Sequence, residues 1–513
     1  MFQRICTQTI RIVAIIIIGI LTILSFLTTA VQEPYSYIDA DGNQIMHDLV
    51  YYRDDRTWAV IVFVIIATFI FALFEYKFRD KGSKYRFRII LGIIYILITS
   101  TYLLTTKFDF YSDASKVVDS LIGIKNGDLI SYDPEGYLFK YPFQAGYMLY
   151  ENIFYSLLGG SGFLVARIFN VFELSIAYFF LIRISKKIFK EIREITLDIL
   201  AFVCAIFLPM MLYTTFLYGI IPAFMFSLIA FDRVVNVVED FKWRDVIISA
   251  VSMALAIQLK SNSMIFMLAI FVYIIGVMFE KKKIILVVIP ITIIANLLAG
   301  SVVKGIMHQM TGRDLPVGLP KTCWVVMGLE ESPIAPGGFN GRGPSLSTEN
   351  GYDYDATNEA AIEEAKARLK KFVKEPKYMV SFFGRKISAQ WNDPLFQSDL
   401  LIENKYDKDN KVYFCLVDGA GRKVIDFILN GLHAWVLLGG LLFFIDKNRK
   451  LSMEELTFII AFIGGFLFHL VWESKSQYAV HYWILLFPYA VIGYRYFACR
   501  ISGLYRLCRK RSH

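Results

Sequence analysis

The sequence predicts an all-α polytopic membrane protein. Of its 513 residues, 56% are apolar and only 19% are charged, and the mean hydropathy is +0.50. Soluble globular domains are poorer in apolar residues and richer in charge. The apolar content excludes a disordered chain. The net charge of +9 comes from basic clusters between apolar segments, so it indicates orientation in a membrane rather than binding to nucleic acid.

Twelve segments are apolar and close to the roughly 17 to 25 residues that a helix needs to cross a bilayer. The predicted spans are residues 11–30, 58–76, 89–106, 163–183, 196–215, 217–231, 246–260, 263–279, 284–302, 424–445, 454–471 and 479–498. The sixth and seventh are the shortest. The first is longer than the core of a signal peptide, so we predict that it is a retained anchor.

Five basic clusters give the predicted orientation of these spans. They lie at residues 77–88, 186–193, 281–283, 447–450 and 500–511. If the first span leaves the cytoplasm, simple alternation places all five clusters on the cytoplasmic side, as the positive-inside rule requires. We therefore predict a multi-pass protein of the cell membrane with both termini in the cytoplasm.

The span pattern divides the chain into five regions. These are three spans (1–106), a first large extracellular loop with interfacial helices (107–162), central spans (163–302), a second large extracellular loop (303–423), and three spans with a basic cytoplasmic tail (424–513). The second loop has many Gly and Pro residues followed by a helical pattern over 357–373, which Pro376 is expected to stop. This loop is predicted to be an ordered cap.

The residues from 108 to 170 carry a series of short motifs. An acid, Asp113, follows a span, and a Gly-Asp pair, a Lys-Tyr-Pro element and an Arg at the next span come after it in order. These are Asp113, Gly127-Asp128, Lys140-Tyr141-Pro142 and Arg167, with Asn170. The order resembles the first outer loop of GT-C glycosyltransferases that use a polyprenyl-phosphate sugar. It resembles in particular family 39, which includes protein O-mannosyltransferases and the lipid A aminoarabinose transferase.

Two later motifs extend the resemblance along the chain, and the segments 324–328 and 337–340 are similar to Gram-positive membrane glycosyltransferases of this type. The sequence LAIQLKSN stands at residues 255–262 and WESKSQY at 472–478. The chain departs from the family pattern where Ala114 replaces a second acid and where Phe139 stands at a position that is Glu in some relatives. The motif loop also follows the third predicted span rather than the first.

The resemblance implies a GT-C-like helical bundle with an extracellular active site. It implies an inverting hexosyltransferase that moves a sugar from an undecaprenyl-type phosphate to a hydroxyl of an envelope glycan, lipid-linked polymer or protein. No cofactor is predicted, although some relatives use a divalent cation. Such a transfer needs a carboxylate base and cations that hold the leaving phosphate. Asp113 is the expected base, with Asp109 and Asp128 as further carboxylates.

Six residues are expected to bind the substrate or the lipid phosphate because they fall outside or near an outer span end. They are Lys140, Lys260, Arg313, Glu473, Lys475 and Tyr478. Lys140 and Lys260 are equally consistent with snorkelling side chains, and Glu473 with Lys475 is consistent with a surface ion pair. The six His residues show no metal-ligand spacing.

Two other functions fit a polytopic protein. One is a transporter or flippase of lipid-linked glycans, which needs ionisable groups near the bilayer midplane, where Arg167 and Glu173 are candidates. The other is a polysaccharide polymerase or ligase with a lipid diphosphate donor. The identity of the released lipid, monophosphate or diphosphate, separates this last function from the transferase.

Overall fold

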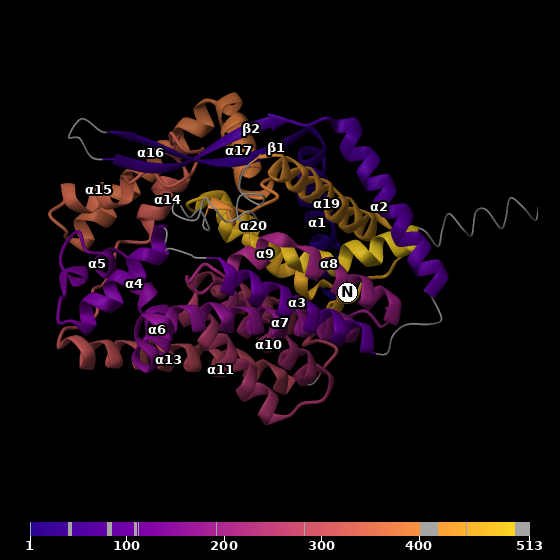
Figure 1. Ribbon diagram of the computed structural model, residues 1–513, viewed down its shortest axis with the longest axis horizontal. Helices are drawn as coiled ribbons and strands as arrows, with labels where there is room; N and C mark the ends of the chain where they lie inside the picture. Colours follow the sequence, from indigo (N-terminus) through magenta and orange to yellow (C-terminus); the bar gives the residue numbers. More distant parts are fainter. Residues whose placement is uncertain are drawn as a thin grey trace, which may run out of the picture.

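The computed structural model shows a helical protein with one long β-hairpin (Figure 1). It describes residues 2–38, 44–78, 85–106, 110, 112–190, 192–281, 283–400, 419–447 and 449–497. Asp109 and the whole predicted basic tail lie outside the described residues.

Helices form most of the chain. In order, they are α1 (Phe2–Leu27), α2 (Thr57–Phe78), α3 (Arg86–Thr105), α4 (Ser112–Lys125), α5 (Tyr137–Lys140), α6 (Ala145–Leu158), α7 (Gly162–Ile188), α8 (Glu194–Ile206), α9 (Leu208–Tyr213), α10 (Ile220–Glu239), α11 (Trp243–Leu259), α12 (Met264–Val277), α13 (Val288–Thr311), α14 (Thr322–Gly328), α15 (Arg342–Glu349), α16 (Tyr354–Lys374), α17 (Pro376–Trp391), α19 (Gly419–Ile445), α20 (Thr457–Val471) and α21 (Val480–Trp483).

Eight helical stretches among the described residues are long and apolar enough to cross a membrane, as expected of a multi-pass membrane protein. They are Gln3–Leu27, Thr57–Phe78, Arg86–Thr105, Pro142–Ile188, Ile220–Glu239, Lys283–Thr311, Gly421–Ile445 and Glu454–Val471. The other predicted spans are helical but shorter or interrupted. For example, 196–215 divides into α8 and α9 at Phe207, and Pro209 stands in the first turn of the second helix.

The β-hairpin is a departure from the purely α-helical prediction. Strands β1 (Thr28–Ile38) and β2 (Gln44–Asp54) pair antiparallel, with Thr28 opposite Asp54 and Ile38 opposite Gln44. The sequence of β2, QIMHDLVYYRD, includes β-branched and aromatic residues, which favour strands. The hairpin reaches the cap, because Ala30 N donates to Asn392 O at 3.0 Å and Val50 N to Ile334 O at 3.1 Å.

The helices form a layered bundle with an apolar outer surface. α1 packs on α19 and α19 on α2, while α7, α10, α11 and α13 follow one another as packed neighbours (Figure 1). α10 is mostly buried, whereas α2 and α13 expose large apolar side chains such as Ile65 at 61% and Leu297 at 64%. An apolar surface of this extent is suited to contact with lipid.

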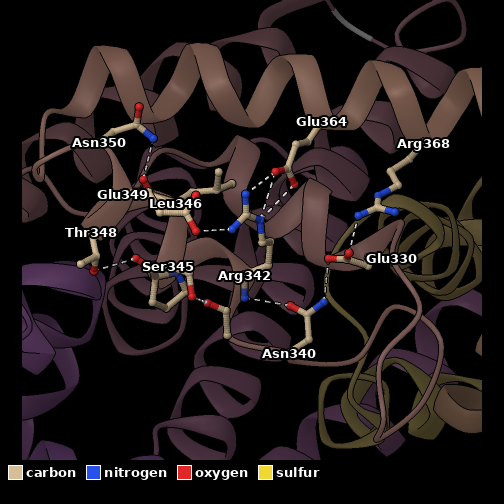
Figure 2. A network of polar contacts seen from close by, with 12 residues as sticks. Glu330, Asn340, Arg342, Ser345, Leu346, Thr348, Glu349, Asn350, Glu364 and Arg368 are labelled. Atoms are coloured by element: carbon tan, nitrogen blue, oxygen red, sulfur yellow. Dashed lines mark hydrogen bonds and ion pairs between the residues drawn. The ribbon is translucent and has the colours of Figure 1, made fainter.

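The described part of the predicted cap contains the helices α14 to α17. Asp353 caps the start of α16, because its carboxylate accepts a hydrogen bond from Ala356 N, and the helix ends at Lys374. Pro376 then occupies the first turn of α17, so it starts a new helix as well as ending the old one. Figure 2 shows the ion pairs of the cap surface, in which Arg342 contacts Glu349 and Glu364.

Candidate functional site

A cavity of about 1370 Å³ lies where the ends of several membrane helices meet the cap. Its walls come from the start of α4, the residues after α5, the ends of α11 and α20, one side of α13, and α14. Six of the residues that the sequence singled out line it: Asp113, Lys140, Lys260, Glu473, Lys475 and Tyr478. Motifs that are separated by up to about 360 positions in the chain are thus brought to one place.

Asp113 lies in the first turn of α4. The helix is held in place by its buried apolar face, which includes Val117 and Leu121. A carboxylate is favourable at this helix end because the backbone N–H groups there carry partial positive charge. Burial raises the pKa of the Tyr141 hydroxyl, and the nearby Asp113 carboxylate adds to this rise. Asp113 also acts electrostatically on Lys260 and Glu473, so the three charges share one environment.

Lys260 is the most deeply placed of the cavity lysines. It follows the last residue of α11 and is only 8% exposed. Its Nζ lies 3.4 Å from the centroid of the Tyr218 ring and 5.8 Å from that of Tyr478. These aromatic faces stabilise the ammonium group through cation–π attraction. An anion that entered the cavity would meet a cation that is already desolvated and oriented.

Glu473 and Lys475 belong to the segment that follows α20. Glu473 is 4% exposed, and its Oε1 has no hydrogen-bond partner among the described residues. Burial raises the pKa of this carboxyl group, while the Lys475 ammonium opposes the rise. Lys475 Nζ lies 5.6 Å from the centroid of the Phe339 ring, a residue of the cap. The segment therefore carries a buried acid and a cation to the boundary between the membrane helices and the cap.

We define the floor of the site as the place where the Lys386 side chain packs against Gly328, Gly337 and residues 470–474. The floor holds the segment after α20 in place. Lys386 is 1% exposed, and its Nζ donates to Gly328 O at 2.5 Å, Leu470 O at 3.1 Å and Trp472 O at 2.8 Å. These carbonyls lie at the carboxyl ends of α14 and α20, so one cation caps two helices. Burial lowers the pKa of Lys386 to about 7, against the opposing effect of Glu473.

A second buried polar group, the Asp393 carboxylate, links the β-hairpin to the segment after α20. Asp393 accepts from Gln32 Nε2 at 3.0 Å and from Ser476 Oγ at 2.7 Å. It also accepts from the backbone N–H groups of Leu395 and Gln397. Burial, with a contribution from Asp399, raises the pKa of Asp393 to about 7. β1, the end of α17 and the segment after α20 are thereby joined beneath the cavity.

Asp128 and Arg313, which the sequence also placed in the site, do not line the cavity. Asp128 Oδ1 accepts from Ile130 N at 2.9 Å and so shapes the turn after α4. Arg313 pairs with Asp133 at 3.0 Å, and both side chains are more than half exposed. Lys140 does line the cavity, but its Nζ also contacts Glu135 at 2.5 Å.

Two polar residues of α7 have structural partners. Arg167 Nε donates to Thr215 O at 3.0 Å, and Asn170 Nδ2 donates to Thr214 O at 3.1 Å. These carbonyls belong to the chain between α9 and α10, where the helix is broken. Arg167 and Asn170 therefore satisfy backbone acceptors inside the bundle.

The sequence motifs did not include Lys386 or Asp393. A signal for Lys386 exists, because it stands four residues after Phe382 and three before Ala389, on the buried face of α17. A lysine within an apolar helical stripe indicates a buried cation that needs partners. Asp393 stands after the helix in an irregular turn and carries no comparable pattern.

Two further findings concern metal binding and similarity to known proteins. Among the described residues, no group of three or more His, Cys, Asp or Glu side chains is arranged to hold a metal ion. No protein-family model, curated protein or solved structure matches the chain.

Proposed function

We propose that the protein is a membrane glycosyltransferase that moves a sugar from a polyprenyl phosphate to a hydroxyl of an envelope glycan, lipid-linked polymer or protein. The observation that carries the proposal is the shared cavity. Asp113, Lys260, Lys475 and Glu473 line one space at the ends of apolar helices. A base and several cations in one cavity are what this transfer requires.

In the proposed reaction, the Asp113 carboxylate takes the proton of the acceptor hydroxyl. The hydroxyl oxygen attacks the anomeric carbon, and the bond from that carbon to the phosphate oxygen breaks with inversion. Lys260 and Lys475 balance the charge that develops on the leaving lipid phosphate. The lipid chain would extend along α13, which contributes Asn296 and Lys304 to the lining and exposes apolar side chains such as Leu297.

The test is release of polyprenyl phosphate by the purified protein supplied with polyprenyl-phosphate hexoses and envelope extract. Asp113→Asn is expected to lower turnover by roughly 10²- to 10⁴-fold, because it removes the general base. Asp119→Asn is the matched control, since Asp119 lies on the same helix, is exposed and does not line the cavity. Equal turnover by Asp113→Asn and wild type would remove Asp113 as the base.

A polymerase or ligase with a lipid diphosphate donor is the second candidate. The observation that favours it is the charge of the lining, where six lysines, Lys116, Lys140, Lys260, Lys304, Lys321 and Lys475, face two acids, Asp113 and Glu473. This is more positive charge than one phosphate requires. Release of a lipid diphosphate would support this candidate, and release of a monophosphate would support the transferase.

A further inference from the structure

A second, smaller cavity of about 420 Å³ lies at the other end of the helix bundle. It is lined by residues at the end of α7, by the turn between α19 and α20, and by residues 492–496. The first cavity is lined by Phe468 and Trp472, at the end of α20, whereas the second is lined by Glu455, just before its start. About 25 Å of helix separates the two ends.

α7 gives the same arrangement independently. Its carboxyl-terminal residue, Ile188, lines the second cavity. Near its start, Phe163 packs against Phe110, which lines the first cavity, with ring centroids 5.0 Å apart. Both helices belong to stretches that are long enough to cross a membrane. The second cavity therefore opens at the membrane face opposite to the candidate active site.

The second cavity is basic. Four cations line it, Lys190, Arg449, Lys450 and Arg495, against two acids, Asp446 and Glu455. Glu455 is already engaged, because one carboxylate oxygen pairs with Arg449 and the other accepts from Ser452 N at 3.0 Å. Lys190 and Lys450 are exposed at the cavity. An excess of positive charge therefore remains for an anion.

Arg449 is built into the cavity wall. Its guanidinium carbon lies 4.4 Å from the centroid of the Phe443 ring and 4.6 Å from that of Tyr496. Its Nε and Nη1 are buried and have no acceptor in the part of the chain that the structure describes. Buried guanidinium donors without an acceptor are uncommon in folded proteins, and an anionic oxygen would satisfy them.

Hydrogen bonds from α1 hold the turn that carries Arg449 in place. Arg11 of α1 donates to Phe444 O at 2.7 Å, Asp446 O at 2.6 Å and Arg449 O at 3.3 Å. Arg449 therefore projects from an anchored backbone. The site is organised before an anion arrives, which lowers the entropy lost on binding.

We propose that this second cavity binds a phosphate group, carried by the headgroup of an anionic lipid or by a free phosphate ion. Guanidinium and ammonium groups are the protein partners of phosphate oxygens. The cavity lies at helix ends, next to exposed Ile445 and close to exposed Phe497, which is the level at which lipid headgroups lie. The proposal does not depend on sugar transfer in the first cavity.

The experiment measures thermal stabilisation of the full-length protein in detergent, since a ligand that binds only the folded state raises Tm with concentration. Dioctanoyl phosphatidic acid is compared with dioctanoylglycerol, which lacks the phosphate. Sodium phosphate is compared with sodium chloride at equal ionic strength. Phosphatidic acid, and not dioctanoylglycerol, is expected to raise Tm.

The Lys190→Gln/Lys450→Gln double variant is expected to weaken the apparent Kd at least ~10-fold, because two charge-assisted contacts are lost. Both side chains are exposed, so folding should be preserved. Lys242→Gln is the control: this exposed lysine precedes α11, at the end of that helix opposite to the first cavity. It should bind like wild type. Arg449→Gln is a further variant, interpreted after its own Tm is measured.

The outcomes separate the two sources of phosphate. A double-variant defect seen with phosphatidic acid alone assigns the site to a lipid headgroup, and one seen with sodium phosphate alone assigns it to a free anion. A defect with both shows that the site accepts either. The proposal is overturned if neither ligand raises Tm, if the double variant binds like wild type, or if Lys242→Gln weakens binding as much as the double variant does.

Discussion

Cations stabilise two neighbouring regions of this protein in different ways. In the floor of the site, Lys386 is buried and donates to three backbone carbonyls. On the cap surface, Arg342 pairs with Glu349 and Glu364 while its side chain remains 28% exposed (Figure 2). When a buried donor is lost, its acceptors are left without a hydrogen bond and water does not take its place. When a surface ion pair is lost, water and salt ions solvate the remaining charges. The floor should therefore be sensitive to mutation, and the cap to solution conditions.

The largest effect is expected from Lys386→Met. One buried and two partly buried carbonyls would lose their donor, and the free energy of unfolding should fall by about 3 kcal/mol. Lys377→Met, an exposed lysine on the same helix, is the control and should change little. Thermal unfolding in detergent compares the two. A loss no larger than that of the control would show that Lys386 does not hold the floor together.

Gly337→Ala tests the floor at the glycine that packs against Gly328 and Lys386. Gly337 has φ +74°, and a Cβ there would lie 2.7 Å from Gly328 O and from Lys386 Nζ. Gly341 has the same φ of +74° but open space around it. Gly337→Ala should cost about 2 kcal/mol, and Gly341→Ala about 1 kcal/mol. Equal effects on Tm would mean that backbone conformation, and not the close packing, determines the loss.

Arg342→Gln tests the cap surface. Removal of a cation from between two partly exposed carboxylates should lower stability by about 1 kcal/mol at low salt. The difference from wild type should shrink in 1 M salt, where the Debye length falls to about 3 Å. Unfolding of Lys386→Met should depend much less on salt because its contacts are buried. A salt-independent Arg342→Gln defect would contradict the distinction between the two regions.

The smallest effect is expected where the cap meets the loop after α4. Glu135 contacts Lys140, Tyr352 and Thr348, and these contacts lower its pKa to about 2, with Lys140 the largest cause. The stabilisation is present above pH ~4.5 and is lost as the pH falls toward 2. Glu135 is largely exposed, so the loss should be a few tenths of a kcal/mol.

Glu135→Gln provides the measurement for this contact. Wild type should lose more stability than the variant between pH 5 and pH 3, because only the wild type has a carboxylate to protonate. At the lowest pH, where the Glu135 carboxylate is protonated, the free energies of unfolding of wild type and variant should become equal. Parallel pH dependence of wild type and variant would show that another group is responsible.

The sequence predicted much of the architecture because membrane insertion imposes local rules. Long apolar runs between basic clusters indicate spans, and α2, α3, α19 and α20 lie where the hydropathy placed them. The cap helix was also predicted from its local pattern. The hairpin was not, because β pairing joins Thr28 with Asp54 and so depends on contacts between segments, rather than on the periodicity of one segment.

For the candidate site, the sequence alone determined the residue types and their order: its motifs contain Asp113, Lys140, Lys260 and Glu473. Only the tertiary structure decided which of them share a cavity, since Asp128 and Arg313 are equally polar yet do not line it. It also revealed Lys386, whose role depends on carbonyls 58 and 84–86 positions away. Chemical identity is a property of one residue, whereas burial and convergence are properties of the packed chain.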